Sequence, residues 1–570
     1  MSAMQSAPCS HRTISRLWER RSALFPLLLV AVCGLLYFWR LDVIPLDDFD
    51  EAYYAEGARE MLERGDLGTP YFNGRPFLLK PALIYWLIAA AFRLFGTTEF
   101  AARAVSAFFG MGVVLLTYWF GARTLGRRAG LLAGAALAVC YMWVDTAREA
   151  MIDMPLTAAL AGAMFLFFIA GMAAKHKRRW LYLGGYGLLG VALLAKGPAP
   201  VGVALVGVLA YAIGAGRLKA TLREAHFAPG IALMLVVAGP WYVYEALREP
   251  GFVSTFFMGE HFGHVHGTLA RTEPWWGHLK NLLVYFWPWT AFLPAALGHA
   301  FGQRARDDVL RFAAWWAVAV VVIFSLARAK LAHYLAPGFP AMAILVGGWL
   351  DRWLEREPVG RGGSGLAFGL LAVGGLACAA GAVLAVTMPP MVTEPLAARY
   401  GSWRPGGAPM VMLGALALGC LGAVAAAWWG RRGAVAPLLA GAMLVAGLAH
   451  VGWLKPRIAE IQAQPRKELA QIAAGALGPE EPLGVFYAKR NATVFYARRP
   501  IVDLGEGEPE GLIELLSSPT PAAALTHEKF LPVLERSPAR VFVWARRGGY
   551  VLVSNHELGE SGEGGGDPAA

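Results

Sequence analysis

The order of apolar and polar residues along the chain predicts a protein that crosses a membrane many times. Long apolar runs alternate with short polar segments, and most runs approach the roughly 17–25 residues that a helix needs to cross a bilayer. We predict thirteen spans, at 23–40, 103–122, 129–145, 154–173, 180–195, 199–215, 228–246, 281–302, 311–327, 332–350, 365–387, 409–429 and 434–453. The apolar segment 82–95 is short for a span, and we expect a helix lying in the outer interface.

After residue 454 the pattern changes to that of a small soluble domain. A helical stretch is expected at Arg457–Leu477, and three segments are typical of strands: Leu483–Tyr487, Thr493–Tyr496 and Arg540–Trp544. The predicted fold is therefore a mostly α-helical polytopic membrane protein with a C-terminal α/β domain. Its predicted parts are a cytoplasmic N-terminus (1–22), a transmembrane domain (23–454), the α/β domain (455–556) and a disordered tail (557–570).

Composition agrees with a membrane protein and argues against nucleic-acid binding. Apolar residues make up 57% of the chain and charged residues 16%, whereas soluble domains carry about 25% charged residues. The net charge of +11 comes largely from Arg and Lys in short loops between apolar runs, as expected of cytoplasmic loops. The five cysteines have no metal-ligand spacing.

The basic loops also orient the predicted spans. With the N-terminus inside, thirteen spans place six basic clusters on the cytoplasmic side, at 123–128, 175–179, 217–223, 304–311, 352–361 and 431–432. The segments with unusual chemistry then share the outer face: 41–100, 146–153, 196–198, 247–280, 328–334, 388–408 and the region after 454. In a bacterium this face of the inner (cell) membrane is periplasmic, and the α/β domain lies there.

The segment after the first span carries the strongest candidate chemistry. Asp50 and Glu51 precede Tyr53 and Tyr54, and Lys80 follows. Asp50 could simply cap a helix that ends at Gly65, or it could serve as a general base or organise a cation. Pro81 fits the first position of a helix over 81–95, which would place Lys80 beside free N–H groups, as in a phosphate site. Anchoring of Lys80 at the interface is the alternative.

Other candidates lie in the remaining outer segments. Asp153 could cap a helix or act in the site, Lys196 could end a helix or bind phosphate, and Lys330, beside Tyr334, could anchor a span. Glu260 and His261 begin a Glu-His-x-x-His-x-His pattern, which could hold a divalent metal or be structural. No nucleotide-binding motif stands out, so a donor for an outer-face enzyme should arrive activated on a lipid.

These residues resemble the membrane glycosyltransferases of the GT-C fold over roughly residues 23–350. The similarity rests on the ordered motifs Asp50-Glu51-x-x-Tyr54-Ala55-Glu56, Lys80-Pro81, Arg103, Asp153, Lys196-Gly197, Glu260-His261 and Lys330-Leu331-x-x-Tyr334. Within this fold the motifs resemble those of the bacterial aminoarabinose transferases that modify lipid A and, more distantly, those of the protein O-mannosyltransferases. The resemblance implies a polyprenyl-phosphate sugar donor, a lipid or glycan acceptor, and an inverting transfer with or without a metal.

The resemblance also implies roles. Asp50 would be the catalytic carboxylate, with Glu51 beside it, and Lys80 would neutralise the departing polyprenyl phosphate. A second set would bind substrate or support the cavity: Tyr53, Tyr54, Asp153, Lys196, His261, Lys330 and Tyr334. Glu260 and His261 would be the metal ligands. The chain has Leu79 where the aminoarabinose enzymes carry a glutamate, and Tyr53 where they carry an arginine, which leaves the sugar and the acceptor open.

Two alternatives remain at this level. A lipid or glycan transporter should carry ionisable residues near the bilayer midplane, whereas here they gather at one interface. A ligase that transfers a whole lipid-linked oligosaccharide would use the same face and the same donor chemistry.

Overall fold

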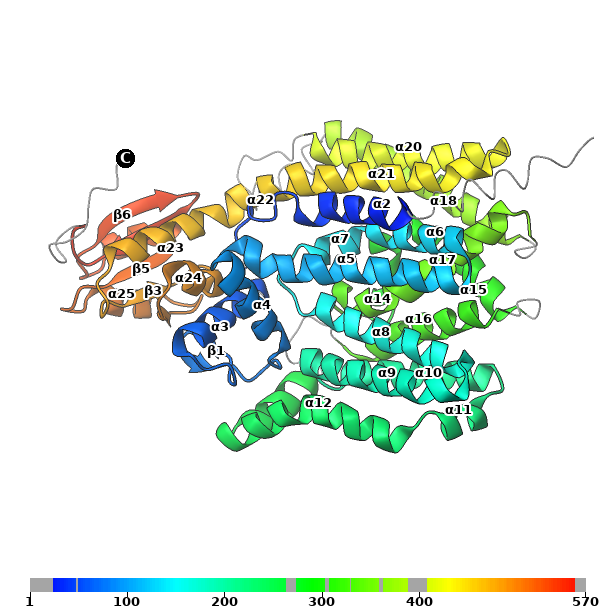
Figure 1. Ribbon diagram of the computed structural model, residues 1–570. Helices are drawn as coiled ribbons and strands as arrows, with labels where there is room; N and C mark the ends of the chain where they lie inside the picture. Colours follow the sequence, from blue (N-terminus) through cyan, green and yellow to red (C-terminus); the bar gives the residue numbers. More distant parts are fainter. Residues whose placement is uncertain are drawn as a thin grey trace, which may run out of the picture.

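The computed structural model describes residues 24–47, 50–262, 273–302, 307–328, 330–357, 362–387 and 407–558. A bundle of long helices forms most of it. At one end of the bundle lie two short helices, α3 (Asp50–Arg64) and α4 (Leu83–Phe95), next to a small β-sheet from the C-terminal region (Figure 1).

The bundle begins with α2 (Leu24–Cys33), which continues as a π-helical turn to Phe38. Its further helices are α5 (Glu99–Thr124), α6 (Arg127–Ala138), α7 (Tyr141–Ala147), α8 (Asp153–Met172), α9 (Lys175–Lys196), α10 (Ala199–Gly214), α11 (Leu218–Glu224), α12 (Phe227–Arg248), η2 (Ser254–Phe262), α14 (Gly277–Tyr285), η3 (Trp289–Phe292), α15 (Leu293–Phe301), α16 (Asp308–Leu326), η4 (Ala332–Gly338), α17 (Phe339–Leu354), α18 (Gly363–Thr387), α20 (Ala408–Trp428), η5 (Arg432–Ala434), α21 (Val435–Ala449) and η6 (His450–Leu454).

Seven helical segments of the described chain are long and apolar enough to cross a membrane. They are Glu99–Thr124, Asp153–Met172, Phe227–Arg248, Asp308–Leu326, Gly363–Ala385, Ala408–Trp428 and Arg432–Gln462. An eighth is added if α6 and α7 together form one span, bent by 63°. A multi-pass membrane protein is therefore confirmed.

Three predicted spans are not continuous helices. The segment 129–145 bends between α6 and α7, and 281–302 is divided among α14, η3 and α15. The segment 332–350 starts as the 3-10 turn η4 before it continues as α17. Pro288 and Pro337 lie at the last two breaks, where a residue without an N–H interrupts the helical hydrogen bonds.

Glycines let the helices near the bundle centre approach each other closely. A methyl group on Gly130 of α6 would lie 2.4 Å from the backbone nitrogen of Ala122 in α5, and one on Gly347 of α17 would lie 2.6 Å from that of Ala133 in α6. Small residues at such crossings bring backbones into van der Waals contact, the main source of helix association in a membrane. Substitution at either glycine would separate these helices.

The segment between α2 and α5 forms a platform at one end of the bundle. It contains α3, the two-residue strands β1 (Tyr71–Phe72) and β2 (Arg75–Pro76), and α4. The apolar faces of α3 and α4 share one buried cluster with residues of the C-terminal sheet, including Leu483 and Leu525. The platform is thus packed on two sides.

The C-terminal region folds into a five-stranded mixed sheet with helices. Strands β4, β3 and β5 are parallel, and β5, β7 and β6 are antiparallel, in the order β4-β3-β5-β7-β6. The elements are α22 (Lys455–Gln462), α23 (Gln464–Ala476), β3 (Leu483–Val485), α24 (Arg490–Ala497), β4 (Ile501–Asp503), α25 (Glu510–Leu516), β5 (Ala523–His527), η7 (Glu528–Phe530), α26 (Leu531–Glu535), β6 (Phe542–Arg547) and β7 (Tyr550–Ser554).

The strand predicted at Thr493–Tyr496 is wrong, because these residues belong to α24. Val494 and Tyr496 are both buried there, and α24 packs against α3 and α23. The β-branched and aromatic residues favour a strand locally, but packing against two helices decides the conformation.

Candidate functional site

Asp50 occupies the first turn of α3, at the start of the platform helix. The helix runs to Arg64 and ends at Gly65, whose φ of +68° suits glycine. Asp50 and Glu51 lie in the first turn, where the helix dipole favours a negative charge. Asp50 is half-buried and Glu51 is buried, so the two neighbouring carboxylates have different environments.

Glu51 is held on both of its oxygens. The Nε and Nη2 atoms of Arg103 donate to its carboxylate, each at 2.7 Å, and the backbone N–H groups of Asp47 and Ala150 donate at 2.8 and 2.7 Å. Burial raises the pKa of Glu51, but Arg103 and these hydrogen bonds together hold it below its usual value. Glu51 therefore stays ionised and fixes the first turn of α3 against two other segments.

Arg103 extends this arrangement to the chain that leads into the platform. Its guanidinium also donates to the carbonyl oxygens of Leu41 (3.1 Å), Ile44 (2.5 Å) and Pro45 (2.9 Å). All of its contacts lie within α5, the 41–47 segment and α3. We call Glu51 and Arg103, with these backbone partners, the clasp.

Lys80 lies in the turn before α4. The helix starts at Leu83, and Ala82 is its N-cap, so the prediction of a helix from residue 81 is wrong by two residues. The first helical hydrogen bond runs from the N–H of Trp86 to the carbonyl of Ala82. Pro81 therefore belongs to the turn, and Lys80 precedes the helix without being its first residue.

Asp153 and Lys196 form an ion pair across two bundle helices. Lys196 Nζ lies 2.7 Å from Asp153 Oδ1, and its ammonium is 4.7 Å from the centre of the Tyr334 ring. Asp153 is buried, and its Oδ2 atom has no hydrogen-bond partner among the described residues. Asp153 is in the first turn of α8, where no side-chain cap hydrogen bond is made, and its Oδ1 atom pairs with Lys196 instead.

His333 is affected by the charges of this ion pair and also by those of the platform residues Asp50 and Lys80. The charges of Asp153, Lys196, Asp50 and Lys80 all act on the His333 imidazole, and Lys80 also acts on Asp153. Five titratable groups from α3, the α4 turn, α8, α9 and η4 therefore share one region, the charge cluster. Sequence reasoning gave His333 no role, although it directly precedes Tyr334.

Two tyrosines predicted to bind substrate lie in different surroundings. Tyr53 is half-buried, and its ring lies 4.4 Å from that of Phe72 and 4.8 Å from that of Phe77, between centroids. Tyr54 is buried in the platform core with its ring edge-on to Tyr85. Only Tyr53 could present part of its ring to a ligand.

Lys330 is buried near η4, and its ammonium group contacts backbone carbonyl oxygens. Its Nζ atom donates to the carbonyl oxygens of Ala327 (2.6 Å) and Glu273 (3.3 Å). These bonds connect the residue after α16 with the start of the segment before α14.

The predicted metal ligands lie outside the side chains that the structure describes. The backbone of Glu260 and His261 belongs to η2, and His264 and His266 fall between described ranges. Among the described residues, no group of three His, Cys, Asp or Glu side chains could hold a metal ion.

A second group of charges joins the bundle to the C-terminal region. Lys455 Nζ lies 2.5 Å from Asp145 and 2.9 Å from Glu149, and His450 lies 3.2 Å from Asp145. Glu149 precedes Ala150, whose N–H binds Glu51. The clasp is therefore continuous with the contacts that hold α22.

A third set of contacts ties the platform to α23 and α24. Lys467 pairs with Glu99 at 2.6 Å. The Tyr496 hydroxyl donates to Glu99 at 3.0 Å and accepts from the Leu46 N–H at 2.7 Å. The chain before α3 is thus held by Arg103 on one side and by Tyr496 on the other.

Sequence comparison finds glycosyltransferases. Residues 79–244 match the family model described as dolichyl-phosphate-mannose-protein mannosyltransferase. The undecaprenyl phosphate-alpha-4-amino-4-deoxy-L-arabinose arabinosyl transferase of Erwinia tasmaniensis is 31% identical over 438 residues, covering 74% of this chain and 76% of the relative. The enzyme of the same name from Edwardsiella ictaluri is 29% identical, covering 68% and 69%.

Solved structures show the same architecture. ArnT from Cupriavidus metallidurans bound to undecaprenyl phosphate aligns with a TM-score of 0.77 and 26% identity, covering 93% of this chain and 98% of that one. The apo oligosaccharyltransferase of Archaeoglobus fulgidus aligns with a TM-score of 0.53 and 12% identity, covering 90% and 70%. This second likeness concerns the fold alone.

Proposed function

Since the chain belongs to the family of the undecaprenyl phosphate-aminoarabinose arabinosyl transferases, it is a membrane glycosyltransferase of the GT-C fold, and we propose that Asp50 and Lys80 carry its reaction. The donor is a sugar on a polyprenyl phosphate, and the acceptor is a lipid or a glycan. The observation that supports this assignment is the charge cluster, in which Asp50, Lys80, Asp153, Lys196 and His333 share one region.

Asp50 suits a group that works on the acceptor. It is half-buried at the start of α3, whereas Glu51 is buried in the clasp. In the transfer, an acceptor oxygen bonds to the anomeric carbon while the bond from that carbon to the phosphate oxygen breaks. Asp50 takes the proton of an acceptor hydroxyl. With a phosphate acceptor, which needs no deprotonation, Asp50 orients it instead.

Lys80 suits the departing phosphate. The C–O bond that breaks leaves its electron pair on the polyprenyl phosphate, so negative charge grows on that oxygen. A fixed cation at this point stabilises the transition state more than the ground state. Lys196 is already paired with Asp153 and lies against Tyr334, so we assign this group to the wall of the donor site.

We assign Glu51 to positioning and not to chemistry, because its two oxygens accept four hydrogen bonds. Tyr53, with Phe72 and Phe77, is proposed as an apolar surface for a sugar ring, since aromatic faces present a large rigid contact area. Tyr54 and Lys330 support the site from the core.

We further propose an orientation of the chain in the membrane, based on the loops that are rich in Arg and Lys. Thirteen spans, with the N-terminus in the cytoplasm of a bacterium, would put the charge cluster on the periplasmic side of the inner membrane. The region 455–556 would then be a periplasmic domain whose contacts with Glu99 and Leu46 place it beside the platform.

The names of the relatives suggest undecaprenyl phosphate as the carrier and aminoarabinose as the sugar, and lipid A is the proposed acceptor. Leu79 and Tyr53 replace residues of the aminoarabinose pattern, so another sugar or acceptor is the competing proposal. A divalent metal at Glu260 and His261 also remains a proposal, and no step above depends on it.

The test compares the lipids of cells that carry wild-type protein, Asp50→Asn, Lys80→Ala or no protein. Mass spectrometry should find one lipid or glycan species that gains a fixed sugar mass in the wild type alone. Glu63→Gln is the matched control, since Glu63 lies on the same helix with 59% of its side chain exposed, and it should behave as wild type.

Full sugar transfer by both purified variants would refute the site. A change in the leaflet distribution of a lipid, without a change in mass, would favour a transporter. The same assay with EDTA decides the metal question: loss of transfer that a divalent ion restores supports a metal, and unchanged transfer argues against it.

A further inference from the structure

A large cavity lies at the other end of the bundle from the charge cluster. Its volume is about 480 Å³, within the range of small-molecule sites, roughly 300–1,000 Å³. Its walls come from α8, α9, α10, α16 and the short helix α11. Met172, in its wall, follows Asp153 along α8 by a length of about 28 Å, at about 1.5 Å per residue. The proposed reaction does not use this cavity.

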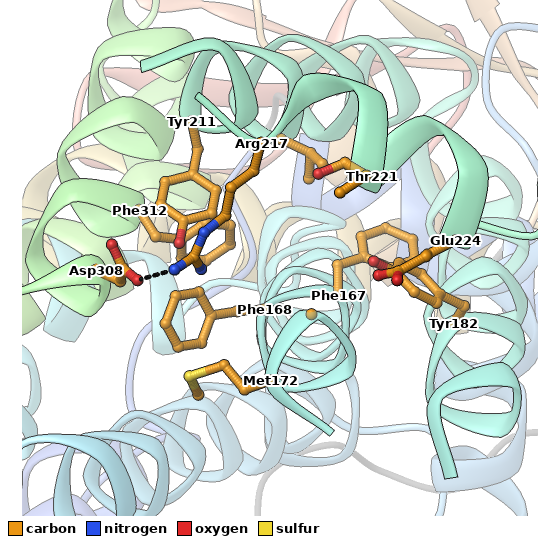
Figure 2. Close-up of a pocket in the computed structure, with 13 residues that line it drawn as sticks. Phe167, Phe168, Met172, Tyr182, Tyr211, Arg217, Thr221, Glu224, Asp308 and Phe312 are labelled. Carbon is orange, nitrogen blue, oxygen red and sulfur yellow. Dashed lines mark ion pairs between the residues drawn. The ribbon is translucent and has the colours of Figure 1, made fainter. Parts of the chain in front are cut away.

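Aromatic rings form the middle of the cavity. Phe168, Tyr211 and Phe312 contact one another, with ring centroids 6.0, 4.9 and 5.4 Å apart. Phe167 and Tyr182 form a second pair at 6.0 Å. Figure 2 shows the two groups on either side of the cavity. Such a surface accepts apolar groups, and its ring faces also attract cations.

Charged residues lie at both ends of this aromatic surface. Arg217 pairs with Asp308 at 3.1 Å at one end, and Glu224 lies beside Tyr182 at the other (Figure 2). Glu224 also pairs with Arg178. Among these four side chains the two cations and two anions cancel, so they alone do not select a purely anionic ligand.

A ligand can replace one partner in each of these ion pairs. The side chains of Arg217, Asp308 and Glu224 are 53, 30 and 39% exposed. Exposed pairs of this kind contribute little to stability, so a ligand that supplies its own phosphate and ammonium can replace each partner with small loss.

We propose that this cavity binds a zwitterionic phospholipid with a primary amine, the chemistry of phosphatidylethanolamine. The phosphate lies against Arg217, and the ammonium donates to Glu224 beside the faces of Phe167 and Tyr182. The first part of an acyl chain covers Phe168 and Phe312. A lipid suits this position because the cavity lies at the C-terminal end of α8 and the N-terminal end of α16, two of the candidate spans, beside the short helix α11.

The test measures lipid binding to the purified full-length protein by native mass spectrometry. Phosphatidylethanolamine, phosphatidylglycerol and phosphatidylcholine of equal chain length are added in turn. Wild type should hold phosphatidylethanolamine best. Gly171→Leu should reduce this binding roughly tenfold or more, because Gly171 lines the cavity and an added Cβ there meets no heavy atom within 4 Å, which leaves room for a leucine side chain beside the ligand site.

The matched control is Gly112→Leu on α5, where an added group also meets nothing within 4 Å but which does not line the cavity. It should bind as wild type. Glu224→Gln keeps the shape and should abolish the preference for phosphatidylethanolamine over phosphatidylcholine, since a hydrogen bond from an ammonium to a carboxylate is lost. If Gly171→Leu does not fold, Glu224→Gln still tests the proposed lipid site.

Equal phosphatidylethanolamine binding by wild type and Gly171→Leu would overturn the site. A preference for phosphatidylglycerol would overturn the zwitterionic assignment, and an unchanged preference in Glu224→Gln would remove the role of the ammonium. Sugar transfer need not change in any of these variants, so the outcome is independent of the proposed function.

Discussion

Replacing Arg103, a residue of α5, with leucine should lower both the stability of the platform and sugar transfer. The side chain is 5% exposed, and Glu51 is 4% exposed. Arg103 donates five hydrogen bonds, two to Glu51 and three to carbonyls of the 41–47 segment. Removing it leaves a buried carboxylate without its cation and frees the segment that leads into α3.

The expected cost follows from the burial. Breaking a buried ion pair by deleting one partner costs about 3–5 kcal/mol, because the remaining charge is uncompensated. Asp50 adjoins Glu51, so the released turn of α3 also displaces the carboxylate that we propose as catalytic. A misplacement of about 1 Å lowers a reaction on the order of 10²-fold. We therefore expect both a lower Tm and a severe loss of transfer.

Two assays on detergent-purified protein check this: thermal unfolding followed by tryptophan fluorescence, and sugar transfer to the acceptor found in cells. Arg93→Leu is the control, because Arg93 is exposed on α4 and such substitutions usually stay within about 0.5 kcal/mol. A double variant, Arg103→Leu with Glu51→Leu, should recover part of the lost Tm, because the uncompensated charge of Glu51 is removed, while the backbone partners of both side chains stay without these hydrogen bonds.

Wild-type unfolding and transfer in Arg103→Leu would show that Arg103 does not hold the platform. A double variant no more stable than the single one would show that the loss does not come from an uncompensated Glu51.

Three further predictions follow from other contacts. Lys196→Met should lower both Tm and transfer, and adding Asp153→Asn should restore the Tm alone, as measured by the same two assays; an unaffected Tm in the single variant would contradict the buried pair. Because the folded pKa of Glu51 lies below its unfolded value near 4.5, its stabilisation is complete above that pH and is lost as the pH falls through the folded pKa. Wild-type Tm should therefore fall more steeply below pH 4.5 than that of Glu51→Gln, and parallel profiles would refute this. Tyr496→Phe loses two hydrogen bonds worth about 1 kcal/mol each, so limited proteolysis should release the C-terminal region faster, and an unchanged rate would show that these bonds do not hold it.

The membrane character and the family could be predicted from the sequence because both depend on the local order of residues. Apolar runs identify spans, and the motif from Asp50 to Lys80 is contiguous enough to recognise. The helix over 50–64 could be predicted for the same reason, since an acidic first turn and Gly65 mark its two ends.

The ion pairs and hydrogen bonds between distant residues could not be predicted, because they depend on which of these residues face each other in the fold. Nothing near Glu51 in the sequence indicates that Arg103 binds both of its oxygens, so the sequence alone does not separate a positioning role of Glu51 from a chemical one. His333 is one of several histidines in outer segments, and only the fold places it among four charges. The strand prediction at Thr493–Tyr496 failed for a different reason. These residues locally favour a strand, but tertiary packing places them in the helix Arg490–Ala497.

The hydrogen bond between Leu46 and Tyr496 joins residues 450 positions apart. At the usual rate of protein synthesis, about 5–20 residues per second, its two ends are made on the order of 20–90 s apart. A nascent chain therefore reaches the bilayer with residues 41–47 already made but without Tyr496, which accepts from Leu46 and donates to Glu99. We expect a chain that stops after the last candidate span to insert with the segment before α3 bound to Arg103 but not to Tyr496.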